Sequence, residues 1–270
     1  MKTLIHDETS IHYVVAGSES PTLLFVHGAN IDLTYWDAQL AYFEDRYNVI
    51  AIDLPGHGQS GRNKPHWTVK GMGEDVAAFI KSLKLEQVIL IGHSLGGNVN
   101  LVAATTYPDP IIGFIGIDNF KSAGQPLPSE YQEQSEQIIQ QLHQNFADTD
   151  EQYARMVLLT PQTPEAVSSR VVQDYREAFQ PMATEIIEAV FKSEYKTEQE
   201  LLPKLPCKLH LINVDYMPTQ EGPLQTYTTK GYAVHHMAGT SHFPMIEKPN
   251  ELNKRLDETI KEILAEKRSK

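Results

Sequence analysis

Short, continuously apolar segments alternate along this chain with segments whose apolar residues recur at helical spacing. Apolar strands that are separated by helices are typical of a parallel sheet covered on both faces. The predicted strands comprise residues 4–6, 11–15, 22–26, 48–52, 88–91, 111–117, 209–214 and 232–237, the first two forming a hairpin. Helices are expected near residues 34–43, 69–83 and 251–267, and directly after Ser94. The pattern predicts an α/β fold with a mostly parallel, eight-stranded sheet and helices on both faces.

The alternation stops between residues 119 and 203, a stretch that is rich in Gln and Glu and contains no comparable apolar strand. This stretch is interpreted as helical. The strand pattern resumes at residues 209–214, so the helices interrupt one sheet and do not follow it. We therefore expect one α/β core made of residues 1–118 and 204–270, with residues 119–203 inserted as a helical cap.

Composition and charge exclude several classes of protein. The net charge of −12 argues against a sequence-independent nucleic-acid binder, because phosphate contacts require clustered Lys and Arg. Cys207 is the single cysteine, so an intrachain disulfide and a thiolate metal cluster are both excluded. No apolar run approaches the ~18 residues of a membrane span, and residues 1–8 lack the apolar stretch of a signal peptide. The expected location is cytoplasmic, without membrane contact.

The most informative segment is residues 92–96, which read Gly-His-Ser-Leu-Gly between an apolar strand and a helix-forming run. A tight turn from strand to helix can hold a serine hydroxyl out at the carboxyl edge of a sheet. The flanking glycines allow close backbone packing, and the start of the helix places a positive dipole end beside the serine. Ser94 is therefore the candidate nucleophile of a nucleophile elbow.

Ester cleavage by a serine also requires a base and an acid that orients this base. His242 is the candidate base, because its loop follows the last predicted strand and can reach the sheet edge. Two aspartates compete for the acid: Asp215 ends the strand after the cap, and Asp118 ends the strand before it. Asp215 is favoured and Asp118 stays the alternative.

Further residues are expected around this site. The N–H groups of Ala29 and Leu95 are the natural pair of oxyanion donors. Asn30, Trp36 and His93 are expected to contact the substrate. Seven apolar cap residues are expected either to line its pocket or to form the cap's own core, namely Met156, Leu158, Leu159, Phe179, Met182, Ile186 and Phe191.

No metal site is expected from the histidines near the end of the chain. His235 and His236 lie within one predicted strand, whose alternation sends them to opposite faces. The triad does its own acid–base work, so no cofactor is expected either.

Four segments together resemble the α/β-hydrolase family, and specifically its helical-capped, esterase-like branch. They are residues 27–29, 53–60, 92–97 and 239–249, and they extend over almost the whole chain except the cap. The resemblance implies an α/β-hydrolase fold with Ser94 as nucleophile, His242 as base and Asp215 as acid. It also implies Ala29 and Leu95 as oxyanion donors, and a structural turn at residues 53–60.

One position departs from the family pattern. The strand before the acid usually carries a glycine three residues ahead of the aspartate, and Ile212 stands there in this chain. Some relatives place the acid after the earlier strand, which keeps Asp118 open. A serine at the elbow argues against epoxide hydrolases and haloalkane dehalogenases, which use an aspartate nucleophile.

The expected function is hydrolysis of small carboxylic esters by a monomer or homodimer. Alternatives are a lactonase, a carbon–carbon bond hydrolase with the same triad, or a ligand-binding regulatory protein with little turnover. Carbon–carbon hydrolysis often uses an arginine to bind an acidic substrate. The cap offers Arg155, Arg170 and Arg176, which are better interpreted as helical surface charges.

Overall fold

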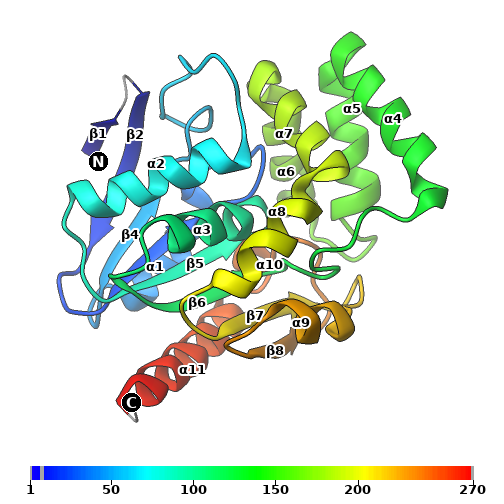
Figure 1. Ribbon diagram of the computed structural model, residues 1–270. Helices are drawn as coiled ribbons and strands as arrows, with labels where there is room; N and C mark the ends of the chain where they lie inside the picture. Colours follow the sequence, from blue (N-terminus) through cyan, green and yellow to red (C-terminus); the bar gives the residue numbers. More distant parts are fainter. Residues whose placement is uncertain (1, 7–8, 269–270) are drawn as a thin grey trace.

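The computed structural model describes residues 2–6 and 9–268. Eight strands form one sheet in the order β1-β2-β4-β3-β5-β6-β7-β8 (Figure 1). The strands are β1 (Lys2–His6), β2 (Thr9–Ala16), β3 (Thr22–Val26), β4 (Asn48–Ile52), β5 (Val88–His93), β6 (Ile111–Ile117), β7 (Leu209–Val214) and β8 (Tyr232–Met237). β1 and β4 each pair with β2 in the antiparallel sense, and the pairs from β4 to β8 are parallel. The predicted mostly parallel, eight-stranded sheet is confirmed. The turn of the opening hairpin, residues 7–8, lies outside the described residues.

Side-chain alternation in the central strands builds a core on each face of the sheet. In β3, Leu24 and Val26 join the cluster on the side of α2 (Val69–Ser82) and α3 (Leu95–Thr106), whereas Leu23 and Phe25 join the opposite one. The opposite face is covered by η1 (Leu33–Trp36), α1 (Asp37–Phe43), α10 (Pro244–Glu247) and α11 (Pro249–Arg268). Burial on both faces explains why these strands are continuously apolar.

Helices fill most of the segment between β6 and β7, and they stand beside the sheet (Figure 1). They are α4 (Ser129–Gln144), α5 (Phe146–Tyr153), the π-helix η2 (Ala154–Leu158), α6 (Glu165–Glu177), α7 (Gln180–Lys192), α8 (Glu194–Leu201) and the short η3 (Leu202–Lys204). A further helix, α9 (Glu221–Tyr227), connects β7 to β8. The helical character expected for residues 119–203 agrees with these elements, and the division into core and cap stays an interpretation.

Within the part of the chain that the structure describes, no helix combines the length and the apolar character needed to cross a bilayer.

Candidate active site

Ser94 sits at a sharp turn between β5, which ends at His93, and α3, which begins at Leu95. Its backbone has φ 50° and ψ −121°, a conformation that non-glycine residues rarely adopt and that costs about 1–3 kcal/mol. Two hydrogen bonds fix the turn: Ser94 N donates to Ile117 O at 3.0 Å, and Gly97 N donates to Ser94 O at 2.8 Å. A strained serine held at the carboxyl edge of a parallel sheet is the geometry of a nucleophile elbow.

The glycines around Ser94 are required by close backbone packing. A Cβ atom on Gly96 would lie 2.3 Å from Val26 O, and one on Gly92 would lie 2.5 Å from Gly96 O. A Cβ on Gly28 would lie 2.6 Å from His93 Nδ1 and 3.3 Å from the Cβ of Ser94. The turn after β3 therefore packs directly against the nucleophile, as an oxyanion loop must.

His242 and Asp118 form a buried pair beside Ser94. His242 Nδ1 lies 2.5 Å from Asp118 Oδ2, and the side chains are 9% and 1% exposed. The other oxygen of Asp118 accepts from Val214 N at 3.2 Å and lies 2.6 Å from Lys121 Nζ. Burial alone would raise the pKa of Asp118, but the hydrogen bond from His242 and the charges of His242 and Lys121 hold it below its usual value. Asp118 is thus kept ionised against the imidazole.

The preferred acid, Asp215, does not meet His242, and this expectation is corrected. Its carboxylate is 49% exposed and lies 3.4 Å from His236 Nδ1. The register pairs Asn213 with His236, and alternation along β7 puts Asp215 on the same face as Asn213. Asp118, by contrast, has φ 46°, and this turn after β6 aims its carboxylate at His242.

Three contacts position the imidazole of His242. His93 Nε2 donates to His242 O at 2.7 Å, and His242 N donates to Leu158 O of the π-helix at 3.0 Å. Tyr216 Oη lies 3.3 Å from His242 Nδ1. His93 was expected to contact the substrate, but it is buried behind His242, and burial together with the charge of His242 lowers its pKa well below the usual value. The structure makes it a support for the His242 loop.

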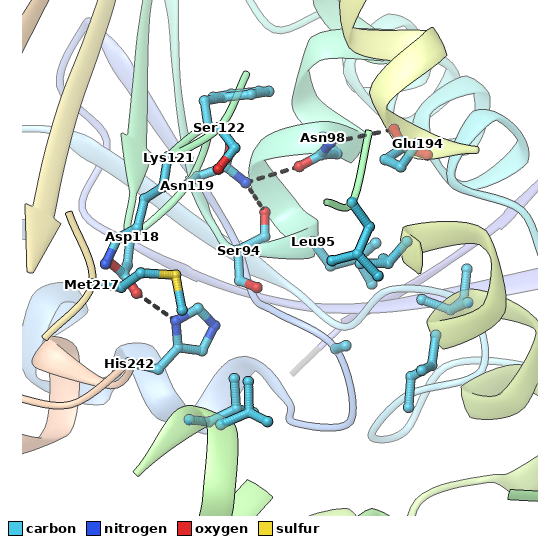
Figure 2. A pocket seen from close by; sticks show the side chains of 18 of the residues that line it. Ser94, Leu95, Asn98, Asp118, Asn119, Lys121, Ser122, Glu194, Met217 and His242 are labelled. Atoms are coloured by element: carbon cyan, nitrogen blue, oxygen red, sulfur yellow. Dashed lines mark hydrogen bonds and ion pairs between the residues drawn. The ribbon is translucent and has the colours of Figure 1, made fainter. Parts of the chain in front are cut away.

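A cavity of about 310 Å³ opens between this edge of the sheet and the helices that follow β6. Ala29, Ser94, Leu95 and His242 contribute to its wall, and Figure 2 shows Ser94 and His242 on it with Asp118 next to the imidazole. Because Leu95 begins α3, its N–H has no partner within the helix, as the sequence led us to expect. The candidate nucleophile, base and oxyanion donors therefore share one cavity.

Several residues expected at the cavity lie elsewhere. Trp36 is fully buried, and its ring packs 5.1 Å from that of Phe25. Asn30 is buried and donates to Asp150 Oδ2 of α5 at 2.7 Å, while burial of that carboxyl raises its pKa to about 8. Leu158 and Ile186 line the cavity as expected, together with Val157, Ile187 and Val190. The described wall of the cavity does not include the other five apolar residues expected there, namely Met156, Leu159, Phe179, Met182 and Phe191.

A polar network that the sequence did not indicate continues from the elbow to α8 (Figure 2). Asn119 Nδ2 donates to Ser94 O and to Asn98 Oδ1, and Asn98 Nδ2 donates to Glu198 Oε1 at 2.7 Å. Glu194 lies 3.3 Å from the same amide; burial and the charge of Glu198 raise its pKa to about 7. The end of the cavity at α8 thus carries two carboxyl groups, that of buried Glu194 and that of half-buried Glu198. Asn119 could have been predicted to lie at this site, because it follows Asp118 directly in the sequence. No sequence pattern indicated that residues of α8 would reach it.

Comparison with known proteins agrees with this architecture. A family model for the alpha/beta hydrolase fold matches residues 21–205, more than half of the chain. The chain therefore belongs to the α/β-hydrolase family.

Three similar proteins illustrate the range of its relatives. The chain is 36% identical over 106 residues to the dihydrolipoyllysine-residue acetyltransferase component of the acetoin cleaving system of Cupriavidus necator, a match covering 39% of this chain and 28% of that protein. It is 32% identical over 108 residues, 40% of each chain, to 3-oxoadipate enol-lactonase 2 of Acinetobacter baylyi. The matches thus span less than half of these two relatives. A thermophilic esterase from Thermogutta terrifontis with malate bound has a TM-score of 0.80 at 20% identity over 97% of both chains, a likeness in fold.

Proposed function

We propose that this protein is a serine hydrolase that cleaves small carboxylic esters through an acyl-enzyme on Ser94. One observation carries the proposal: the elbow serine and His242 line one cavity, and His242 is hydrogen-bonded through Nδ1 to the buried carboxylate of Asp118. This bond holds the ring so that Nε2 is the nitrogen available to Ser94. Asp118 takes the orienting role that the sequence analysis gave to Asp215.

The reaction follows from these positions. His242 Nε2 takes the proton of Ser94 Oγ as the oxygen attacks the ester carbonyl, and the N–H groups of Ala29 and Leu95 bind the resulting oxyanion. His242 then gives its proton to the leaving alkoxide oxygen, which departs as the alcohol. Water attacks the acyl-enzyme with His242 again as base, and the carboxylic acid and free Ser94 are released. Preorganised oxyanion donors contribute about 10²–10³ in rate each.

The cavity supports an ester with a compact apolar part. Its apolar wall comes from the π-helix and α7, through Leu158, Ile186 and Ile187, and its volume of about 310 Å³ suits a small ligand. A lactone is a cyclic ester and requires the same steps, and the similarity to an enol-lactonase supports lactones as a second substrate class.

Carbon–carbon hydrolysis has less support. Arg155 and Arg176 pair with Glu151 on the cap surface, and Arg170 lies over the ring of Tyr35. None of the three belongs to the described wall of the cavity. The arginine that would bind an acidic dienol substrate is therefore lacking among the described lining residues.

The decisive experiment compares Ser94→Ala with a matched loss of another hydroxyl from the same cavity, Ser122→Ala. Hydrolysis of nitrophenyl acetate, butyrate and octanoate and of a panel of lactones is measured for both variants. We expect a loss of about 10⁴-fold or more in kcat for Ser94→Ala and wild-type rates for Ser122→Ala. Unchanged hydrolysis by Ser94→Ala would refute the mechanism.

Fluorophosphonate labelling separates a hydrolase from a ligand-binding protein of the same fold. An activated Ser94 Oγ forms a covalent adduct that adds mass to the intact protein, and Ser94→Ala prevents it. Wild-type protein that stays unlabelled and turns over none of the esters or lactones would favour the regulatory, ligand-binding alternative.

A further inference from the structure

A second group of chemistry-bearing side chains lies away from the active-site cavity. His210 of β7, His235 of β8 and Glu262 of α11 come together where α11 packs against the sheet near β7. The register pairs Ile212 with His235, so the two histidines are diagonal neighbours on the face of the sheet that α11 covers. Three separate segments of the chain thus contribute one side chain each.

The geometry of this cluster suits one shared ion. The three ligand atoms, one nitrogen of each imidazole and one carboxylate oxygen of Glu262, all lie within 4.8 Å of one another. His210 Nδ1 and His235 Nε2 lie 3.8 and 3.7 Å from the same oxygen of Glu262, Oε2. Two ligand atoms bound to one zinc ion at about 2.0–2.1 Å are roughly 3.3 Å apart in a tetrahedron. Each nitrogen–oxygen separation is therefore about half an ångström longer than in a zinc site, and the half-exposed Glu262 side chain and the two rings would move together as the ion binds.

The buried ring of His210 is the second indication. Its side chain is fully buried, and neither ring nitrogen has a hydrogen-bond partner. The buried Nε2 of His235 has none either. By contrast, the fully buried His27 uses both nitrogens, one toward Gly28 O and the other toward Leu54 N. A buried polar group without a hydrogen bond is destabilising, and a metal ion would satisfy two of these nitrogens at once.

We propose that His210, His235 and Glu262 bind a divalent transition-metal ion of the zinc class. Two imidazole nitrogens and one carboxylate oxygen form a donor set suited to zinc, whereas calcium and magnesium prefer oxygen ligands. The fourth position is left to a water molecule, because Glu262 faces solvent. An ion bound there links the edge strand β8 to β7 and α11. His235 and His236 were expected not to form a metal pair, and the proposed site instead joins His235 to a histidine of another strand.

The test is zinc binding to the full chain without a polyhistidine tag. Isothermal titration with Zn²⁺ is expected to give one ion per chain, and excess zinc to raise Tm by roughly 5 °C at 100-fold over Kd, reversibly with EDTA. The variants Glu262→Gln and His235→Ala should each bind zinc at least about tenfold more weakly. Bound Co²⁺ should show the visible absorption of a low-coordinate site in the wild type and lose it in both variants.

Matched controls exclude other zinc sites. His236→Ala removes the neighbouring histidine, which pairs with Asp215, and Glu258→Gln removes a carboxylate of α11 that pairs with Arg255. Both controls should bind zinc as the wild type does. The proposal is overturned by absence of saturable binding, by wild-type affinity in Glu262→Gln, or by loss of binding in His236→Ala. His235→Ala and Glu262→Gln alter partly exposed side chains, so the test does not depend on a variant of buried His210 folding.

Discussion

The ends of β6 and β7 are neighbours in the sheet, and each carries an aspartate beside a histidine. At the end of β6, Asp118 is buried, ionised and held by His242, Lys121 and the N–H of Val214. At the end of β7, Asp215 is half exposed and lies 3.4 Å from His236. Two similar pairs on adjacent strands thus have different environments, and environment decides which carboxylate can orient a catalytic base.

The difference shows how a strand end becomes a functional position. The chain leaves β6 through a residue with positive φ, which turns the Asp118 side chain across the sheet edge toward His242. It leaves β7 without such a turn at Asp215, so side-chain alternation directs this residue toward His236. A single backbone turn therefore separates the buried pair from the surface pair.

The largest expected effect comes from the amide variants of the two aspartates. Asp118→Asn should lower kcat about 10⁴-fold, because the base loses the carboxylate that fixes its tautomer. Asp215→Asn should stay within about twofold, as expected for an exposed group outside the cavity. Ester hydrolysis by both purified variants is compared at neutral pH. The reverse order of the two effects would restore Asp215 as the acid.

A smaller effect is expected from Lys121→Met, which keeps the length of the side chain and removes its charge. Lys121 helps to hold the pKa of Asp118 low, so its loss should raise that pKa. Asp118 would then be protonated at higher pH, and the acid limb of the kcat profile should move to higher pH, with the loss of kcat largest on the acid side of neutral pH. Lys64→Met, which breaks the remote ion pair with Asp75, is the control and should leave the profile unmoved.

Tyr216→Phe should have a weaker effect still. Its hydroxyl lies 3.3 Å from His242 Nδ1, whereas its ring, which contacts Lys121 Nζ at 4.2 Å, is retained in phenylalanine. Loss of one neutral hydrogen-bonding group should lower kcat about threefold. Tyr195→Phe removes a hydroxyl from another side chain of the cavity wall and should leave kcat unchanged. A loss above a hundredfold in Tyr216→Phe would give Tyr216 a direct part in the reaction.

The smallest effect is expected at the surface pair. A double-mutant cycle with Asp215→Asn and His236→Ala should give a coupling free energy of unfolding below about 1 kcal/mol, because both side chains are about half exposed. Added salt should reduce it further. Denaturant unfolding of the wild type, the two single variants and the double variant measures this coupling. A value near 3 kcal/mol would contradict the prediction, because it would mean that the pair of Asp215 and His236 is as strongly coupled as a buried pair.

Local patterns predicted the fold and part of the candidate site. The strand 22–26 appears where the sequence places it, because burial on both faces leaves a nearly continuous apolar run. Ser94 could also be predicted from the sequence, because its glycines and the strand and helix that flank it are contiguous along the chain. The acid could not be predicted in this way, because the choice between Asp118 and Asp215 depends on a backbone turn and on burial by distant segments. Trp36 illustrates the same limit, since proximity in sequence to Ala29 says nothing about which way its ring packs.

The hydrogen bond from His242 N to Leu158 O links the helical layer over the cavity to the loop that carries His242. Leu158 ends the π-helix, so the helical layer that walls the cavity is also hydrogen-bonded to the backbone of the candidate base. A hinge movement that lifted this layer to admit a larger substrate would have to break that bond or carry His242 along with it. In the proposed mechanism, the opening of the cavity and the position of the base are therefore coupled through one carbonyl group, so substrate size would affect kcat as well as KM.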